Sequence, residues 1–341
     1  MKYITFVVPS YNSSAYMRNS IESLLPGGND VEIIIVNDGS IDNTLQIARE
    51  YEENYPSIVK VIDKENGGHG SGVNAGIELA SGLYFKVVDS DDWVDYDSYM
   101  ELLRVVKENY HKGITIDCYF SNFVYENQEK QTQYELSMIR EFPQNTLFSW
   151  NETKKFKTGK FIMMHSVMYL TEVLKKSKTK LLTHTFYVDN IYIYQPLPYC
   201  KSLYYLPVPF YRYFIGRVDQ SINIDNMVKR YDQQLRVMDY ISNLYTLDYL
   251  RSLPKRQYKF ILHHLENLSF TTMLFIYANY DKEKKKAYKL YWNHFKETNY
   301  KLYRKIRWHS LVAVPFLLVM PLRKLAVVEG YKVVKRITNW G

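Results

Sequence analysis

The stretch Gly82-Leu-Tyr-Phe-Lys-Val-Val-Asp-Ser-Asp-Asp-Trp-Val-Asp95 runs from a short apolar segment directly into a group of carboxylates. Residues 84–88 have the length and composition of a buried strand. Three acids follow this strand at once: Asp89, Asp91 and Asp92. Ligands bind beyond the carboxyl ends of the strands in an open parallel sheet, so these acids predict a site for a hard divalent cation that carries phosphate oxygens. The alternative is a polar turn in which Asp92 or Asp95 caps a helix that begins near Tyr96.

Three earlier parts of the 341-residue chain show the same pattern, an apolar run that opens into small polar residues. The expected strands are residues 3–8, 31–36 and 59–62, and the helices after them are residues 16–25, residues 45–55 and a segment that ends at Ala80. Four such alternations within about 110 residues predict a parallel sheet with right-handed crossovers, because parallel neighbours need a helical return. All four loops then meet at one sheet edge, where Tyr11, Asp38, a glycine run and the acids would line a nucleotide cleft.

The glycine run is Asn66-Gly-Gly-His-Gly-Ser-Gly-Val-Asn74. Part of it, Gly70-x-Gly72-x-x-Ala75, fits a loose dinucleotide pattern, but that motif belongs to the first turn of its unit, which here is Pro9-Ser-Tyr-Asn12. It is not a P-loop either, since no Gly-Lys-Ser/Thr follows. A glycine-rich turn before a helix offers backbone N–H groups to a phosphate, and a tight turn without a ligand is the alternative.

The net charge of +8 hides an asymmetry between the two parts of the chain. Residues 1–100 contain 6 Lys and Arg against 16 Asp and Glu, whereas residues 101–341 contain 38 against 20. The acidic first part argues against nucleic-acid binding, and the basic remainder indicates an anionic partner such as phosphate or lipid headgroups. The two cysteines, Cys118 and Cys200, have neither metal-site nor disulfide-framework spacing, which favours a reducing compartment.

After residue 105 the pattern becomes less regular. We expect a strand at residues 114–123 and a helix at residues 163–176, and a half-exposed strand is one interpretation of residues 185–194. In this last segment Asp189 stands among aromatic and apolar residues, where an acid is either a surface group or a general base with a raised pKa. Further along, Arg212 and Arg217 are either phosphate ligands or solvated charges.

The C-terminal part is helical and then strongly basic. Residues 227–299 have the periodicity of packed helices, and residues 282–341 contain 15 Lys and Arg against 3 Asp and Glu. Within the basic part, residues 308–322 carry no charge except the titratable His309. This segment is shorter than the roughly 20 residues that cross a bilayer, so with its basic flanks it predicts an interfacial anchor on an anionic membrane. A buried helical hairpin or an oligomer contact is the alternative.

Four motifs resemble the family 2 inverting glycosyltransferases with the GT-A fold. They are Val7-Val-Pro-Ser-Tyr-Asn12, Ile34-Ile-Val-Asn-Asp-Gly-Ser40, Asn66-Gly-Gly with Asn74-Ala-Gly-Ile77, and Val88-Asp-Ser-Asp-Asp-Trp93. The resemblance implies an α/β fold with a mostly parallel nucleotide-binding sheet flanked by helices, followed by a C-terminal helical region. The domains would be residues 1–222, divided into a nucleotide-sugar part (1–110) and an acceptor side (111–222), a helical region at 223–300 and a membrane-associating tail at 301–341.

The resemblance also implies roles for single residues. In the Asp-x-Asp motif Asp91 would bind Mg²⁺ or Mn²⁺, with Asp89 as a second candidate ligand. The general base would be Asp189, although Val188 replaces the Glu that usually precedes it. The residues implied in donor binding are Pro9, Tyr11, Asn12, Asp38, Gly68, His69, Asn74, Asp89, Ser90, Arg212, Arg217 and Ser221. Many members have Arg at the position of Val73, and His69 or Arg217 would supply that positive charge.

The function implied is that of a metal-dependent inverting glycosyltransferase. It would move a single sugar from a nucleotide sugar, most often a UDP-sugar, to a lipid-linked or polysaccharide acceptor in capsule, exopolysaccharide or cell-wall glycan synthesis. We expect a peripheral protein at the cytoplasmic face of the membrane that binds no nucleic acid and associates with itself or with a partner glycosyltransferase. The alternative is a non-catalytic, nucleotide-binding scaffold subunit of a glycosyltransferase complex.

Overall fold

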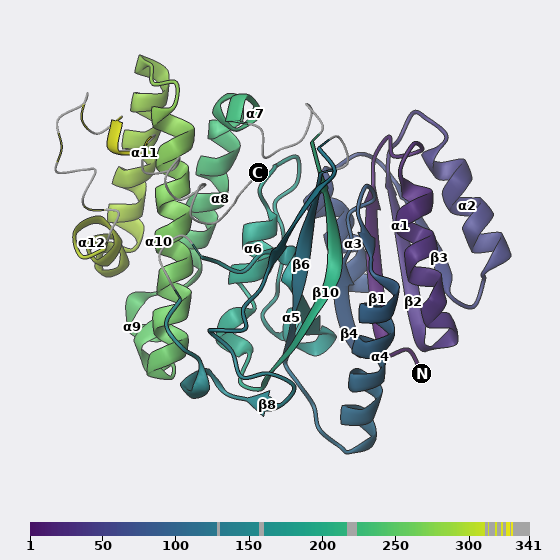
Figure 1. Ribbon diagram of the computed structural model, residues 1–341. Coiled ribbons are helices and arrows are strands. Elements are labelled where there is room, and N and C mark those ends of the chain that lie inside the picture. Colours follow the sequence, from purple (N-terminus) through teal and green to yellow (C-terminus); the bar gives the residue numbers. More distant parts are fainter. Residues whose placement is uncertain are drawn as a thin grey trace. The chain divides into compact units, whose positions relative to one another are not determined.

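Two parts of the chain fold as separate units in the computed structural model (Figure 1). The structure describes residues 1–127, 130–156, 160–216 and 224–310, together with residues 313, 318, 322, 325–327 and 329. The first unit comprises Met1–Lys154 and Met163–Gly216, and the second comprises Lys155–Ile162 and Arg217–Gly341.

The first unit begins with the expected alternation of strands and helices. Its elements are β1 (Ile4–Ser10), α1 (Met17–Leu24), β2 (Val31–Asp38), α2 (Thr44–Asn54), β3 (Val59–Lys64), α3 (His69–Leu79) and β4 (Tyr84–Val87), with the short 3-10 helix η1 (Leu25–Asp30) before β2. The strands lie in the order β3-β2-β1-β4 and all pair in parallel. Every residue of β1, β2 and β4 is buried, which is why these strands read as continuous apolar runs rather than alternating ones.

The sheet continues beyond β4 with mixed pairing. The further elements of this unit are β5 (Trp93–Val94), α4 (Tyr96–His111), β6 (Cys118–Asn127), β7 (Thr132–Leu136), β8 (Leu147–Phe148), η2 (Trp150–Glu152), η3 (Met164–Ser166), β9 (Val167–Leu170), α5 (Thr171–Lys176), α6 (Asp189–Tyr194), η4 (Leu197–Tyr199) and β10 (Leu203–Ile215). The sheet goes on in the order β4-β9-β6-β10-β5, with β9 antiparallel to both its neighbours and β10 parallel to β6. Two further strands pair antiparallel beside this path, β7 with β6 and β8 with β10. The α/β fold with a mostly parallel sheet in its first half is therefore confirmed.

Two interpretations of local structure are wrong. The helix expected at residues 163–176 is instead the turn η3, the strand β9 and then the helix α5. Residues 167–170 form a strand because they pair with β4 on one side and with β6 on the other. The half-exposed strand that was one interpretation of residues 185–194 is a loop followed by the helix α6. All of residues 191–194 are buried, so that helix shows no apolar stripe from which a 3.6-residue period could be read.

The second unit is helical, as the sequence predicts for residues 227–299. Its helices are α7 (Ile224–Lys229), α8 (Tyr231–Leu244), α9 (Leu247–Ser252), α10 (Lys255–Tyr277), α11 (Lys282–Thr298) and α12 (Tyr300–Trp308). Aromatic rings of α11 pack against one another and against Tyr303 of α12, with Trp292 near the centre of the group. Across the described ranges, no helix is both long and apolar enough to span a membrane.

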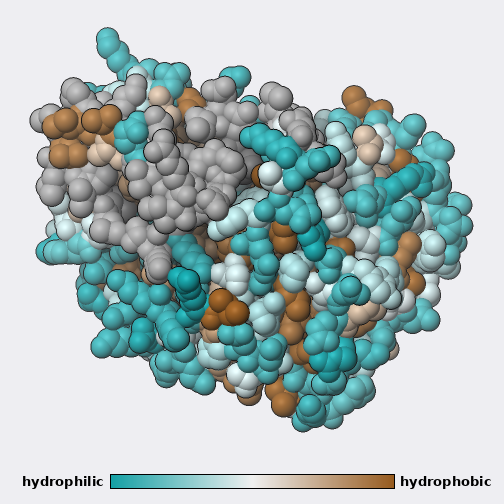
Figure 2. All heavy atoms as spheres, in the orientation of Figure 1, coloured by the Kyte–Doolittle hydropathy of each residue, from teal (hydrophilic) through white to brown (hydrophobic). Residues whose placement is uncertain are grey.

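Hydrophilic side chains cover most of the visible face of the sheet unit in Figure 2. Hydrophobic residues stand among them singly or in small groups. This distribution is ordinary for a folded domain whose apolar residues are mainly in the core. On this face, sites are therefore better sought among the polar clusters than on a broad apolar surface.

Candidate functional site

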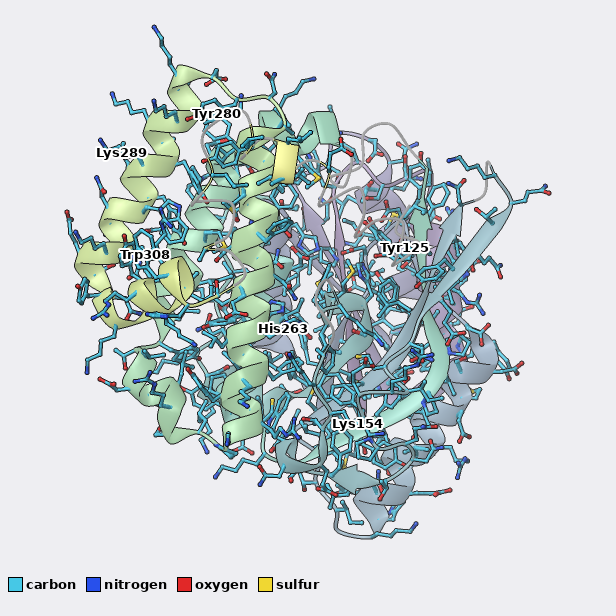
Figure 3. The ribbon with its side chains drawn as sticks, turned by 60° about the vertical axis from the view of Figure 1, so that its left-hand side comes forward. Tyr125, Lys154, His263, Tyr280, Lys289 and Trp308 are labelled. Atoms are coloured by element: carbon cyan, nitrogen blue, oxygen red, sulfur yellow. The ribbon has the colours of Figure 1, made fainter. Side chains whose placement is uncertain are left out.

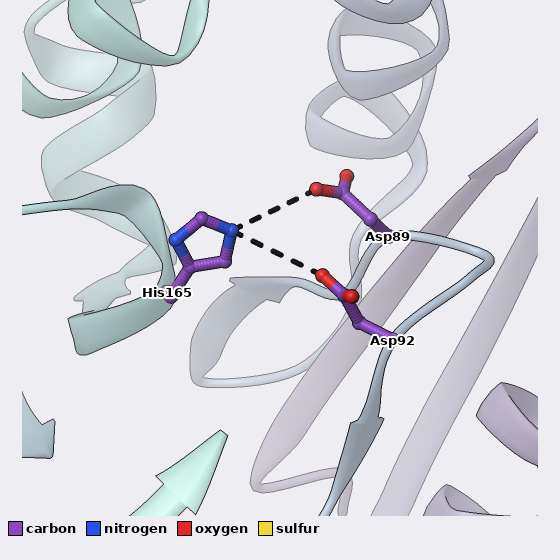
Figure 4. Close-up of side chains that lie close together, drawn as sticks. All are labelled: Asp89, Asp92 and His165. Atoms are coloured by element: carbon purple, nitrogen blue, oxygen red, sulfur yellow. Dashed lines mark ion pairs between the residues drawn. The ribbon is translucent and has the colours of Figure 1, made fainter. Parts of the chain in front are cut away.

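Two carboxylates and an imidazole face one another just beyond the end of β4 (Figure 4). The Nε2 atom of His165 lies 3.9 Å from Asp89 Oδ2 and 4.0 Å from Asp92 Oδ2. One ligand atom from each of the three residues lies within 4.8 Å of the others, which is close enough to share a cation. The acids come from the loop after β4, as the sequence predicts, but His165 comes from η3 and was not anticipated.

A buried lysine holds the turn that carries His165. Lys86 is 1% exposed, and its Nζ donates hydrogen bonds to the backbone carbonyls of Met164 (3.2 Å), His165 (2.5 Å) and Val167 (3.0 Å). Burial lowers the pKa of Lys86 to about 7. The one sign of this arrangement in the sequence is a lysine inside the apolar run of β4, where a buried cation needs several acceptors.

The ring of His165 is fixed by aromatic neighbours from β10. It stacks on Tyr213, with centroids 4.3 Å apart and planes at 20°, and meets the edge of Tyr211 at 4.7 Å. Burial lowers the pKa of His165 to about 4, so the ring is neutral at neutral pH. Neutral imidazole is the form that binds a metal ion.

Asp92 ties the acid loop to β10 and is wholly buried. Its Oδ2 accepts a hydrogen bond from the Tyr211 hydroxyl (2.6 Å), and its Oδ1 accepts one from the Phe214 N–H (2.8 Å). The Tyr211 hydroxyl in turn accepts a hydrogen bond from the Asp89 N–H (3.0 Å). Burial, aided by the charges of Asp91 and Asp89, raises the pKa of Asp92 well above its usual value. Asp92 therefore positions the loop, and Asp89, whose pKa is lowered, is better placed to act as an ionised carboxylate.

Asp89 forms an ion pair with His69, the first residue of α3. His69 Nε2 lies 2.8 Å from Asp89 Oδ1. Burial acts against the charge of Asp89, but the charge and hydrogen bond of His69, with His165 and Lys86, hold its pKa below the ordinary value. Burial likewise opposes protonation of His69, yet Asp89, Asp189 and Asp91 together raise its pKa. The pair is therefore favoured as carboxylate and imidazolium.

Asp189 enters the same site from a distant part of the chain. It is the first residue of α6, and its carboxyl is close enough to His69 and Asp89 for their charges to act on its pKa. Burial raises the pKa of Asp189 to about 6. The charge of Asp89 adds to this rise, whereas the charge of His69 opposes it. Two carboxyl groups of one site thus have opposite pKa shifts, Asp89 below and Asp189 above the usual value.

The loops that follow β1, β2 and β4 meet at the expected edge. Ser13 Oγ is hydrogen bonded to Ser90 Oγ at 2.7 Å, and Asn12 N donates to Ser40 Oγ at 3.0 Å. Pro9 lies in β1, and the ring of Tyr11 beyond it is exposed. The first loop is thereby joined both to the second loop and to the acid loop.

Asp38 binds the glycine turn rather than standing free. Its Oδ1 accepts hydrogen bonds from Lys64 Nζ (2.7 Å) and Gly67 N (2.9 Å), and its Oδ2 accepts one from Gly68 N (2.7 Å). Gly68 has a φ of 81°, and a Cβ there would approach His184 N to 3.0 Å. The glycine turn is therefore held from both sides, and its role toward a donor stays a prediction.

Two other residues with predicted donor roles are engaged elsewhere. Asn74 exchanges two hydrogen bonds with the backbone of Leu181 (2.8 and 2.9 Å). The guanidinium of Arg212 forms ion pairs with Asp95 and Glu126, each at 2.9 Å. Asp95 also accepts the Ser98 N–H, which confirms it as the cap of α4. Arg217 and Ser221 lie outside the described residues.

Comparison with known sequences gives a family match for the first part of the chain. Residues 5–173 match the model of Glycosyl transferase family 2. EpsH of Bacillus subtilis is 29% identical over 246 residues, which cover 68% of this chain and 64% of EpsH. The poly(ribitol-phosphate) beta-N-acetylglucosaminyltransferase TarS of Staphylococcus aureus is 24% identical over 252 residues, 69% of this chain and 43% of TarS. The chain thus matches less than two thirds of the length of either relative.

Solved structures agree with the fold. TarS residues 1–349 in complex with UDP superpose with a TM-score of 0.67 at 17% identity, covering 97% of this chain and 91% of that chain. The mannosyltransferase PcManGT of Pyrobaculum calidifontis, in complex with GDP-Man and Mn²⁺, gives a TM-score of 0.52 at 12% identity, with 99% and 87% covered. Likeness at these identities concerns the fold alone. The match over residues 5–173 shows that the chain belongs to glycosyl transferase family 2, and the structural likeness shows that its fold is GT-A-like.

Proposed function

We propose that this chain is a metal-dependent, inverting glycosyltransferase that moves a single sugar from a nucleotide sugar to a lipid-linked or polysaccharide acceptor. The observation that carries the proposal is the cluster of Asp89, Asp92 and His165 beyond β4, which Asp189 joins from α6, with the pKa of Asp89 lowered and that of Asp189 raised. A carboxylate that stays ionised suits the side that holds cation and phosphate. A carboxyl with a pKa near the working pH suits proton transfer.

Asp189 would act as the general base. Its carboxylate takes the proton of an acceptor hydroxyl while that oxygen forms a bond to the anomeric carbon of the donor sugar. The bond from the same carbon to the diphosphate oxygen breaks at the opposite face, and the electron pair leaves with the nucleoside diphosphate. One displacement of this kind inverts the anomeric centre, and its rate depends on how well hydroxyl, carbon and leaving oxygen are aligned.

Asp89 and Asp91 are the residues that would hold Mg²⁺ or Mn²⁺. Carboxylate oxygens are the ligands that these hard cations prefer, and the neutral ring of His165 turns its Nε2 toward the same space. Asp91 acts on the pKa values of both His69 and Asp92, so its carboxyl belongs to the cluster. A bound cation neutralises the charge that develops on a leaving diphosphate. His69 adds a positive charge where many family members have Arg at the position of Val73.

A UDP-sugar is the donor that the comparisons favour. TarS is named as an N-acetylglucosaminyltransferase of poly(ribitol-phosphate), and one of its structures holds UDP-GlcNAc. That structure has a TM-score of 0.66 with this chain. We therefore place UDP-GlcNAc first among donors to test and a bacterial surface polysaccharide first among acceptors.

The test of the proposed function is hydrolysis of a panel of nucleotide sugars by the purified protein. We expect nucleoside diphosphate release from one UDP-sugar in Mn²⁺ and its loss in a chelator, because the leaving group needs its charge neutralised. Calorimetric titration with UDP accompanies the panel, since release can require an acceptor. Absence of both release and UDP binding in Mn²⁺ would contradict the proposal.

We further propose that the basic C-terminal region holds the enzyme at the cytoplasmic face of the membrane. The helices α11 and α12 expose both cationic and apolar side chains, among them Lys289 and Trp308 (Figure 3). Trp308 is 48% exposed, and the guanidinium of Arg307 lies 4.2 Å from its ring centroid. Aromatic rings beside cations are suited to the headgroup region of an anionic bilayer.

Deletion of residues 311–341 should weaken membrane binding by at least about tenfold, because five basic residues are lost and each contributes on the order of 1 kcal/mol near an anionic surface. The measurement is flotation with vesicles that contain or lack an anionic phospholipid, at low and high salt. We expect the full chain to float only with anionic vesicles and less at high salt. Equal flotation of both proteins would show that residues 311–341 do not contribute to membrane binding. Flotation of neither protein would contradict membrane binding itself.

A further inference from the structure

The loop of residues 183–188 carries two aromatic side chains, Phe186 and Tyr187, which are separated from Asp189 by Val188. The ring of Phe186 is 44% exposed, and that of Tyr187 is half-buried, with its centroid 6.3 Å from that of Phe186. Thr185 and Val188 on either side are buried. The loop is thus anchored by its buried residues Thr185 and Val188, and it exposes an aromatic ring three residues before the proposed general base.

The backbone of this loop is strained at two residues. His184 has a φ of 46° and Tyr187 has a φ of 65°, both in the left-handed region. For a bulky aromatic residue this region is a genuine outlier, and residues held there cost on the order of 1–3 kcal/mol each. Such strain persists only where the surroundings impose it, and it concentrates at ligand-binding positions.

Hydrogen bonds on both sides impose the strained conformation. The His184 N–H donates to the Gly67 carbonyl at 2.6 Å, which fastens the loop to the glycine turn. The Tyr187 carbonyl accepts from Asn190 Nδ2 at 2.9 Å and from the Asn190 N–H at 3.3 Å. The first contact fixes where the loop begins, and the second fixes where Tyr187 passes into α6. Phe186 stands between these two fixed points.

We propose that Phe186 and Tyr187 form the surface that receives a pyranose ring of the acceptor, an inference that rests on the proposed function. The acceptor hydroxyl must reach the carboxylate of Asp189, so the sugar that bears it lies next to the residues just before Asp189. An aromatic face contacts the apolar C–H face of a sugar and leaves the hydroxyl groups at its edge free. The strained loop then serves to hold the rings beside the base, and the glycine turn to which it is fastened lies on the donor side.

The first test places a fluorine reporter on the loop. A single trifluoromethylphenylalanine at position 186 is observed by ¹⁹F NMR during titration with the methyl β-glycosides of glucose, N-acetylglucosamine, galactose and mannose. We expect a saturable shift with at least one glycoside at concentrations up to about 50 mM, since one stacked sugar gives millimolar affinity. The same reporter at Tyr96, which is 61% exposed on α4, is the matched control and should not shift. No saturable shift at position 186, or equal shifts at both positions, would overturn the proposal.

The second test separates acceptor binding from the donor side. Phe186→Ala should raise the KM for the acceptor about tenfold, the loss expected for one aromatic contact, with the KM for the donor changed less than about twofold. Phe186→Trp should restore the acceptor KM, and Tyr96→Ala should leave it unchanged. An acceptor KM unaffected by Phe186→Ala contradicts the inference. Absence of both nucleotide-sugar hydrolysis and UDP binding in the unmodified protein would instead contradict the proposed function, which keeps the two outcomes distinct.

Discussion

Replacing Asp189 by asparagine is expected to slow nucleoside diphosphate release by about 10²- to 10⁴-fold, the contribution typical of a positioned general base. Asparagine keeps the shape of the side chain but cannot take a proton. Donor binding should persist, because the proposed cation ligands and the donor loops lie on other segments. The measurement is the rate of UDP release together with the dissociation constant for UDP in Mn²⁺.

The same substitution should change the pH profile. Burial raises the pKa of Asp189 to about 6, and the base acts only when it is deprotonated. Activity of the unmodified enzyme should therefore fall as the pH drops below about 6, where this carboxyl binds a proton. The residual activity of Asp189→Asn should lack that acidic limb.

A matched control for this substitution is Asp97→Asn on the exposed first turn of α4, which should leave both the rate and the profile intact. Normal turnover by Asp189→Asn would remove the assignment of the base. An unchanged acidic limb in that variant would assign the titration to another group.

The sequence could predict the part of the fold in which local signals agree. The strands β1, β2 and β4 are buried along their whole length, and each one ends in small polar residues, so their positions follow from composition alone. Parallel connection through helices then brings the loops to one edge without further information. The sequence distinguishes Asp189 as an acid among apolar residues, and by itself it leaves both a surface group and a general base open.

The remainder of the site depends on contacts between distant segments. His165 faces the acids only because β9 inserts between β4 and β6. The residues next to His165 in the sequence carry no signal that predicts this pairing. Arg212 is drawn into ion pairs because β10 lies between β6 and β5, which carry Glu126 and lead into Asp95. A single motif cannot predict these ion-pair partners, since neither Asp95 nor Glu126 stands out from the residues around it in the sequence.

Asp91→Asn should weaken Mn²⁺-dependent donor binding by more than about 100-fold, since even the partners behind a metal ligand contribute 10- to 100-fold. Turnover should be lost with it. Thermal stability should change little, because the Asp91 side chain is only half-buried and its carboxyl adds negative charge to a crowded acidic cluster. The measurements are calorimetric titration of UDP with and without Mn²⁺ and the midpoint of thermal unfolding.

Asp92→Asn is the comparison for this prediction, because it should lower the stability of the fold, whereas Asp91→Asn should weaken donor binding. Asp92 is wholly buried and accepts hydrogen bonds from the Tyr211 hydroxyl and the Phe214 N–H. An amide group retains one of these acceptors and turns the other into a donor, which should cost about 1–3 kcal/mol in the free energy of unfolding. Substitution of the two neighbouring acids should thus have different effects: Asp91→Asn should lower Mn²⁺-dependent donor affinity, and Asp92→Asn should lower the free energy of unfolding. If Asp91→Asn instead destabilised the fold and left Mn²⁺-dependent binding intact, the cation would have to be held by Asp89, Asp92 and His165.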